Sequence, residues 1–233
     1  NEIVGKAPDP LKLVELEGDT SFIDAANRSY VLAWTRQWVE ALDLITDVAE
    51  IRPDIPYLLW AEWWLNQPGV AQSMTWDQFA SGILVDLAKI ASKCPFPTAK
   101  DDPRMANLQA AWRIIASIRG IHGGQSFVWF TASMLSRRLG NLDEGLGCAQ
   151  HAFQLEPAWN NAIGVANILR DQKKVDEAAQ WFKKAREYDK DDVSSHLDCG
   201  DMYLDHQRWD DAIREYEAVN KKQADHPWAT ASI

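Results

Sequence analysis

Cysteine is scarce in this sequence, and its placement excludes two classes of crosslinked domain. Three of the 233 residues are cysteine, at positions 94, 148 and 199. An odd number of widely separated thiols gives neither a disulfide framework nor the close pairs of a structural zinc site. We therefore expect Cys94, Cys148 and Cys199 to be free thiols, packed in the interior of a protein from a reducing compartment.

Basic residues are also in the minority. The chain has 24 Lys and Arg against 34 Asp and Glu, a formal net charge of -10 at pH 7. Binding to nucleic acid depends on Lys and Arg side chains that displace counterions from the phosphates. The composition therefore argues against nucleic acid and favours a protein or peptide partner with apolar and basic residues.

No hydrophobic run is long enough for a membrane span, so we expect no membrane insertion. The most apolar stretch, PYLLWAEWWL at 56–65, contains Glu62 and has about half of the ~20 residues that a span requires. The N-terminus lacks the pattern of a secretory signal, although the chain begins at Asn1 and a leader already removed would leave no trace. We predict a cytoplasmic location.

An internal repeat is present in the second half. Small or apolar residues recur there at a stride of 33 or 34 positions. The equivalent sets are Gly145, Ala178 and Ala212; Ala149, Phe182 and Tyr216; and Ala152, Ala185 and Val219. A stride of this length is typical of stacked supersecondary units.

Each repeat reads as two helices. An acidic pair precedes each of these sets, at 143–144, 176–177 and 210–211. Acidic residues in a first turn complement the positive end of the helix dipole, so the pairs mark helix starts. The segment before each pair repeats in the same register. Its equivalent sets are Trp129, Ala162 and His196, and the small residues Ser133, Ala166 and Gly200, which allow close helix approach.

These features resemble the tetratricopeptide repeat (TPR). Residues 126–157 match best, with a turn at Gly140-Asn141 and a closing Pro157, whereas the next two units close on Lys190 and Ala224. The resemblance implies an all-α fold, a right-handed α-solenoid of helix-turn-helix repeats. The expected repeats are 126–157, 159–190 and 193–224, within a TPR domain at 126–225, and residues 226–233 begin a further helix.

The first half is less regular. We expect an N-terminal extension at 1–20 and a divergent, Trp-rich helical region at 21–125, where Ala41, Ile45, Val48 and Pro53 reproduce the repeat spacing. Apolar spacing and Pro starts predict helices at 56–65, 76–91 and 103–119. Strict pairing requires an even number of helices. Either the linker at 94–103 contains a short turn of helix, or the array is interrupted there.

Tryptophan is abundant, with 12 in the chain. Seven fall before residue 120: Trp34, Trp38, Trp60, Trp63, Trp64, Trp76 and Trp112. The spacing of Trp60, Trp63 and Trp64 places them on one broad helix face. Packing between layers is one interpretation, and a recognition surface, including one for self-association, is the other.

The resemblance also implies a binding groove, because the first helix of each TPR pair lines the concave surface where peptides or partner helices lie. Carried over to this sequence, the groove residues are Phe127, Phe130, Met134 and Arg137; Asn160, Ile163, Asn167 and Arg170; and Ser194, Leu197, Asp201 and Asp205. Its last part is acidic, which indicates either a solvated surface or recognition of a basic partner. Ile163 stands where TPR carboxylate clamps carry Lys, so we predict that this chain is not a clamp.

Sequence motifs of catalysis are missing. The sequence contains no G-x-S-x-G, phosphate-binding loop, dinucleotide fingerprint or H-E-x-x-H. His122-Gly123-Gly124 reads as a tight turn, and His196 occupies a packing position of the repeat. We therefore expect no enzymatic activity, no cofactor and no metal site. The predicted function is that of a scaffold or adaptor that binds a protein in its groove. The alternative is a regulatory or substrate-recruiting module of a larger enzyme, such as a glycosyl- or sulfotransferase.

Overall fold

Every regular element in the computed structural model is a helix within residues 20–232, the part of the chain that the structure describes. The expected extension at 1–20 lies outside the described residues, apart from Thr20. The chain divides into two compact units, residues 1–141 and 142–233, which are described separately below.

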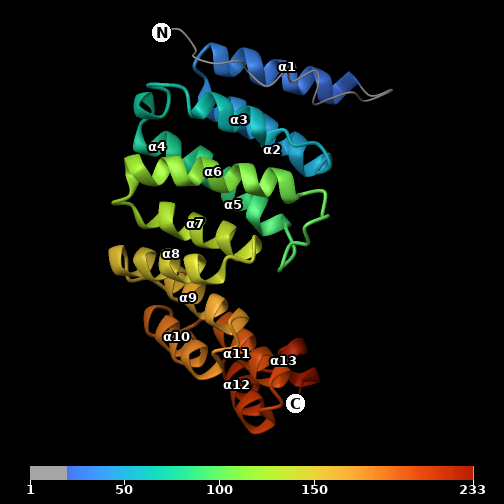
Figure 1. Cartoon of the computed structure of the whole chain (residues 1–233). Helices are drawn as coiled ribbons and strands as arrows, with labels where there is room; N and C mark the ends of the chain where they lie inside the picture. Colours follow the sequence, from blue (N-terminus) through green and yellow to red (C-terminus); the bar gives the residue numbers. More distant parts are fainter. Residues whose placement is uncertain (1–19, 233) are drawn as a thin grey trace. The chain divides into compact units, whose positions relative to one another are not determined.

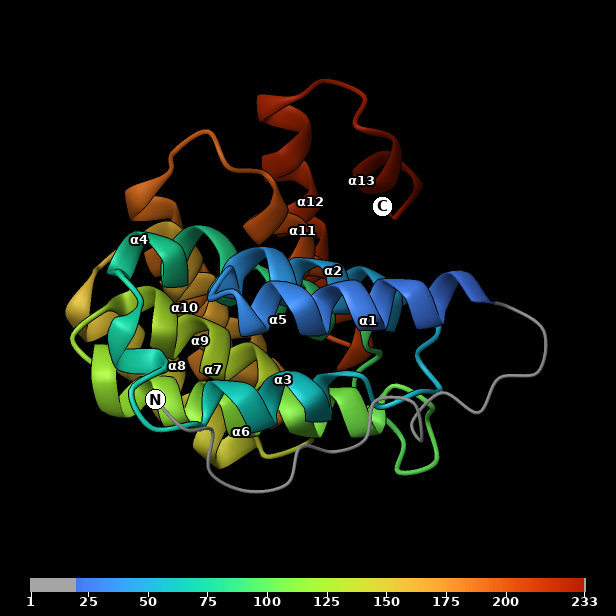
Figure 2. The same cartoon turned by 90° about the horizontal axis from the view of Figure 1, so that it is seen from above.

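Unit 1 is built from helices that pack on their neighbours (Figure 1). They are α1 (Thr20–Trp34), α2 (Trp38–Ile51), α3 (Leu58–Leu65), α4 (Trp76–Gln78), α5 (Leu84–Lys93), α6 (Met105–His122) and α7 (Ser126–Arg138). A 3-10 turn covers Ala71–Ser73, and a π-helical segment, Phe79–Ile83, joins α4 to α5. Helices α1 and α2 lie side by side (Figure 2).

The helix that begins at Trp76 starts where the sequence provides a capping box. The Thr75 hydroxyl accepts a hydrogen bond from the Gln78 amide at 3.3 Å, and the Gln78 side chain accepts one from the Thr75 amide at 2.9 Å. Further along, a Cβ atom added to Gly82 would overlap a methyl group of Val39 on α2. Glycine at this position is what allows the π-helical segment to lie against α2.

The structure answers the question about helix pairing in unit 1. Residues 95–104 form turns and bends but no helix, so the linker does not contain the missing element. The predicted helices at 56–65, 76–91 and 103–119 are present, the second as the continuous helical segment 76–93. Helix α7 packs against both α5 and α6. The regular alternation of pairs is therefore interrupted in this unit.

Unit 2 is a run of helices in which each packs on the next. They are α8 (Leu142–Leu155), α9 (Trp159–Asp171), α10 (Val175–Tyr188), α11 (Ser194–Asp205), α12 (Trp209–Lys222) and α13 (Pro227–Ala231). The predicted repeats 159–190 and 193–224 correspond to the pairs α9–α10 and α11–α12. The predicted repeat 126–157 spans the boundary between the units.

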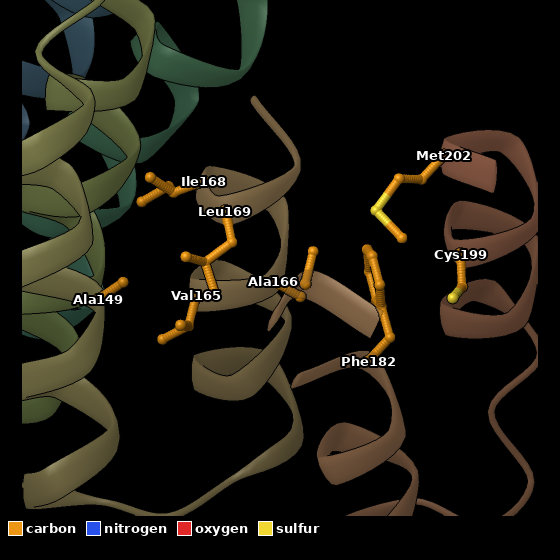
Figure 3. Packing of buried hydrophobic residues seen from close by; sticks show 9 residues of the cluster. Ala149, Val165, Ala166, Ile168, Leu169, Phe182, Cys199 and Met202 are labelled. Atoms are coloured by element: carbon orange, nitrogen blue, oxygen red, sulfur yellow. The ribbon is translucent and has the colours of Figure 1, made fainter. Parts of the chain in front are cut away.

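The equivalent positions of the repeat are all fully buried. Ala152, Ala185 and Val219 each have 0% exposure. In Figure 3, Phe182 of α10 lies between Ala166 of α9 and the side chains that α11 contributes to the same cluster. One of those side chains is Cys199; Cys94 and Cys148 are likewise buried, and none of the three cysteines is in a disulfide among the described residues.

The core of unit 2 is divided into clusters that share members at their edges. One cluster contains Val165, Leu169 and Phe182 among its buried residues, and another contains Tyr216 and Val219. The half-buried Tyr203 packs against both. A third cluster, around Phe153, Ala162 and Ala185, shares Ile163 and Trp181 with the first.

A close helix crossing explains the small residue at position 200. A Cβ atom there would lie 2.7 Å from the Cε1 atom of Tyr216, closer than real side-chain contacts allow. Glycine therefore lets α11 approach the buried ring of α12, as the repeat pattern predicts for its small positions.

The turns between paired helices share one backbone geometry. Gly140, Lys173 and Gln207 follow the repeat stride, and their φ angles are 79°, 61° and 57°. The left-handed region costs a residue with a Cβ roughly 1–2 kcal/mol, a cost that glycine avoids. Only the first of these turns has the residue that its conformation favours.

Lys173→Gly is therefore expected to stabilise unit 2 by about 1 kcal/mol, since relief of the left-handed strain exceeds the extra chain entropy of glycine. Urea unfolding followed by circular dichroism measures the change. Lys174→Gly is the matched control, because Lys174 is equally exposed but has φ -88°. A Lys173→Gly variant that unfolds at lower urea concentration than the wild type contradicts this account.

Candidate functional site

The predicted groove residues of unit 2 lie on helix faces that the core leaves accessible. On α9 the buried residues include Ala162, Val165 and Leu169. Asn160 is exposed, and Ile163, Asn167 and Arg170 are half-buried on the other side of the helix. On α11, Ser194 and Asp205 are exposed, and Leu197 and Asp201 are half-buried. We call these eight residues the α9–α11 face.

The acidic residue at the end of this face already has a cationic neighbour. The guanidinium of Arg170 on α9 lies 3.4 Å from the Asp205 carboxylate on α11, whose side chain is 65% exposed. An exposed pair of this kind contributes less than about 1 kcal/mol. A basic side chain of a partner can therefore displace Arg170 at little cost.

Asp201 joins three helices. Its Oδ1 atom accepts a hydrogen bond from the Tyr216 hydroxyl of α12 at 2.6 Å and one from the Trp228 indole of α13 at 3.0 Å. Burial, followed by the bond to Asp201, raises the pKa of Tyr216. Both bonds use Oδ1, and a carboxylate has further acceptor capacity on its second oxygen. The sequence analysis did not identify Trp228, which is 57% exposed beside the predicted face.

Other acidic residues near α11 are used within the chain. Asp192, just before α11, accepts hydrogen bonds from the amides of Ser194 and Ser195 at 2.9 and 3.0 Å, which satisfies two free donors of the first turn. Burial alone would raise the pKa of Asp192, but the bonds from Ser194 and Ser195 outweigh it and set the pKa at about 2. Arg208 pairs with Asp176 and Asp211. Asp176, Asp192 and Asp211 therefore have structural roles within the chain.

The predicted groove residues of α7 belong to unit 1. Phe127, Phe130, Met134 and Arg137 are all half-buried. The two phenyl rings stack with centroids 6.3 Å apart, and the Arg137 guanidinium lies 5.1 Å from the centre of the Phe96 ring. This part of α7 is therefore an apolar surface supported by the linker before α6.

Sequence reasoning missed a charged cluster that joins α10, α11 and α12. Glu215 Oε2 lies 2.7 Å from the Arg186 guanidinium and 2.6 Å from His196 Nδ1. The three side chains are between 14% and 19% exposed. His196 was predicted to be a packing residue, and its ring does lie in the interior, with an ionic partner that the sequence did not indicate.

Gly123 and Gly124 form a turn after α6, as predicted, and His122 is the last residue of that helix. The Gly123 carbonyl accepts a hydrogen bond from the Trp129 indole at 2.7 Å. The His122 ring contacts Phe79 edge-on at 4.5 Å, and burial lowers the pKa of His122. These contacts place His122 in the packing of unit 1.

Residues 20–232 contain neither a metal-binding cluster nor a helix that could span a membrane. Among these residues, no group of three or more His, Cys, Asp or Glu side chains is arranged to hold a metal ion. Within the same range, no helix combines the length and the apolar character that crossing a bilayer requires.

Comparison with known proteins identifies the repeat. A family model described as tetratricopeptide repeat matches residues 169–231, from the end of α9 through α13. Residues 169–231 are tetratricopeptide repeats, and the described chain has a helical-repeat fold of that type. No curated protein sequence matches this chain.

Solved structures with the same fold are numerous. YrrB, described as a TPR protein with an unusual peptide-binding site, has a TM-score of 0.51 at 14% identity, over 97% of this chain and 98% of YrrB. A TPR protein from Parabacteroides merdae has a TM-score of 0.53 at 13% identity, over 92% of this chain and 71% of that one. MamA from Desulfovibrio magneticus RS-1 has a TM-score of 0.52 at 11% identity, over 91% and 99%. The predicted fold class, all-α with helix-turn-helix repeats of the TPR type, is confirmed.

Proposed function

We propose that this chain is a scaffold or adaptor that binds an extended segment of a protein partner along the α9–α11 face. The observation that carries the proposal is the accessibility of the predicted residues: all eight are exposed or half-buried, including Ile163 and Leu197, which pack against the edges of the core clusters. YrrB, which has the same fold, is described as having a peptide-binding site.

The side chains of the face favour a partner of mixed character. Ile163 and Leu197 occupy equivalent positions of successive repeats and offer half-buried apolar surface. Asp201 and Asp205 lie further along α11. A segment with one apolar side chain and a Lys or Arg a few residues away matches this arrangement. Since Arg170 is the present neighbour of Asp205, the partner's cation would replace it.

Asp205→Lys is the sharpest test of this surface. Asp201→Lys would break the bonds to Tyr216 and Trp228, whereas Asp205 is exposed and its pair with Arg170 is weak. A partner is first isolated by affinity capture, and its binding to purified variants is then measured by calorimetry at low and high salt. We expect Asp205→Lys to weaken binding about tenfold and to reduce its salt dependence.

Asp191→Lys provides the matched control, because it makes the same charge change at an exposed site in the loop before α11. It should leave the affinity within about twofold of the wild type. Equal affinities of the Asp205→Lys variant and the wild type would remove the α9–α11 face from the binding site.

A further inference from the structure

Three aromatic rings of unit 2 meet where α8 lies next to α10. Phe153 of α8 contacts Trp181 of α10 at a centroid distance of 5.0 Å and Tyr188 at 5.9 Å, and the rings are close to perpendicular in both pairs. A lysine lies on the same face of α10, because Trp181, Lys184 and Tyr188 follow one another at i, i+3 and i+7. We call the three rings, Phe153, Trp181 and Tyr188, the α8–α10 aromatic site.

The ammonium group of Lys184 lies on two of these rings. Its Nζ atom is 4.5 Å from the centre of the Phe153 ring and 4.7 Å from the centre of the Trp181 ring. Both distances are within the range of about 6 Å over which a ring attracts a cation. The attraction arises because an aromatic ring carries partial negative charge on its face. The structure therefore shows a positive charge bound at this site, supplied by the chain itself.

The rings are the only partners of this ammonium group in the described part of the chain. Among residues 20–232, Lys184 forms neither a hydrogen bond nor an ion pair. A primary ammonium has three N–H donors, and donors that ring faces cover lose hydration without gaining an acceptor. The Lys184 side chain is also half-buried rather than enclosed. It is therefore held weakly and can move into solvent at little cost.

Ring faces without a nearby acceptor favour a cation that has no N–H donors. A quaternary trimethylammonium group keeps the positive charge that the faces attract, and it leaves no donor unpaired. An unmethylated lysine has no advantage over Lys184, which is already in place. A neutral group of the same shape lacks the attraction between charge and ring. The net charge of -10 also favours the approach of a cationic ligand.

We propose that the α8–α10 aromatic site binds a trimethylated lysine side chain of a protein partner, which displaces Lys184. A lysyl side chain already fits against Phe153 and Trp181, so the methylated side chain has a matching stem and the same charge. Tyr188 is 46% exposed and provides the wall nearest to solvent. Lys184 occupies the site while the partner is absent, and it lowers the apparent affinity by the fraction of molecules in which it is in place.

Lys184→Met tests the displacement, because methionine keeps an apolar stem and removes the competing charge. The full chain is titrated with an uncharged glycine peptide that carries one trimethyl-lysine, and two-dimensional NMR of the indole N–H groups follows the signal of Trp181. We expect this signal to shift and saturate, and Lys184→Met to bind about fivefold more tightly than the wild type, as the release of two weak cation–π contacts allows. Lys183→Met is the matched control, because it removes the same charge at the exposed neighbouring position; it should keep the wild-type affinity.

Changes to the peptide separate charge from shape. A peptide with unmethylated lysine, and a neutral one with a tert-butyl group in place of trimethylammonium, should each bind at least about tenfold more weakly. Equal binding of the neutral peptide overturns the cation site, and so does an absence of binding by both the wild type and Lys184→Met. Equal affinities of Lys184→Met and Lys183→Met overturn the displacement. Choline that binds as tightly as the peptide would assign the site to a small amine instead of a protein. None of these side chains belongs to the α9–α11 face, so the two proposals are tested separately.

Discussion

Glu215→Ala is expected to lower the free energy of unfolding of unit 2 by about 3 kcal/mol. The substitution leaves the Arg186 guanidinium without its carboxylate partner at a site where both side chains are less than a fifth exposed. Removing one member of a buried ion pair costs roughly 3–5 kcal/mol, because the remaining charge is uncompensated. Partial exposure places this cluster at the lower end of that range. Urea denaturation followed by circular dichroism measures the loss.

The pH dependence gives the same variant a second readout. Burial by itself would raise the pKa of Glu215, but the hydrogen bond from His196 and the charge of Arg186 outweigh it and lower the pKa below the usual 4.5. A carboxyl group with a lowered native pKa stabilises the fold above its unfolded pKa, and this contribution disappears as the pH falls through the native value. Glu215→Ala should therefore flatten the acid side of the stability profile.

Glu217→Ala is the control for this experiment. Glu217 is exposed on the same helix, two positions away, and its removal should change stability by less than about 0.5 kcal/mol. If both variants unfold at the same urea concentration, the cluster contributes no more than an ordinary surface charge.

Asp86→Asn is expected to act in the opposite direction and to stabilise unit 1. Asp86 is 5% exposed, and its Oδ2 atom has no hydrogen-bond partner among the described residues. Burial, followed by repulsion from Asp43, raises its pKa from 3.8 to about 7. Asp47 and Glu50 of α2 add to this repulsion, and Lys89, which pairs with both of them, partly offsets it. The carboxylate form is thus destabilising at neutral pH.

The sign of the pH effect follows from proton uptake. Between about pH 4 and pH 7 the native state holds a proton on Asp86 that the unfolded chain has lost, so stability falls as the pH rises. Each pH unit in this window is worth about 1.4 kcal/mol, which gives an upper limit of about 4 kcal/mol. Asp86→Asn should recover most of this loss at pH 8 and change little near pH 4.

Denaturation monitored by tryptophan fluorescence at pH 4, 6 and 8 measures this difference. Asp101→Asn serves as the control, because Asp101 is exposed in the linker before α6. A wild-type protein whose stability is constant between pH 4 and pH 8, with an Asp86→Asn variant of equal stability, would contradict the assigned charge state.

The helix pairs of unit 2 could be predicted because their signal is local and repeated. Ala152, Ala185 and Val219 follow one stride, and all three are fully buried. The ionic and polar contacts could not be predicted in this way. Tyr216 and Trp228 reach Asp201 from positions 15 and 27 residues away, and Arg186 reaches Glu215 across 29. Such pairs depend on the angle between helices, which periodicity does not specify.

In unit 1, too, the apolar spacing predicts the helices but not the way in which they pack. The predicted helices are present, but the π-helical geometry of Phe79–Ile83, which packs on α2, has no signature in apolar spacing. The sequence also did not determine which of the tryptophans are buried and which are exposed. Trp60 and Trp64 became core residues, whereas Trp34, the last residue of α1, remained exposed. The binding roles of the predicted groove residues remain predictions.

Some side chains of unit 2 pack against two core clusters at once. These shared residues determine how local unfolding spreads from one helix pair to the next. Tyr203 packs against the cluster around Phe182 and against the one around Tyr216. In a repeat array each unit depends mainly on its neighbours, so the last helices can fray without melting α8 and α9. The cooperativity of this stretch is therefore set by a few half-buried side chains, and a partner that immobilises Tyr203 would make the helices on either side open as one.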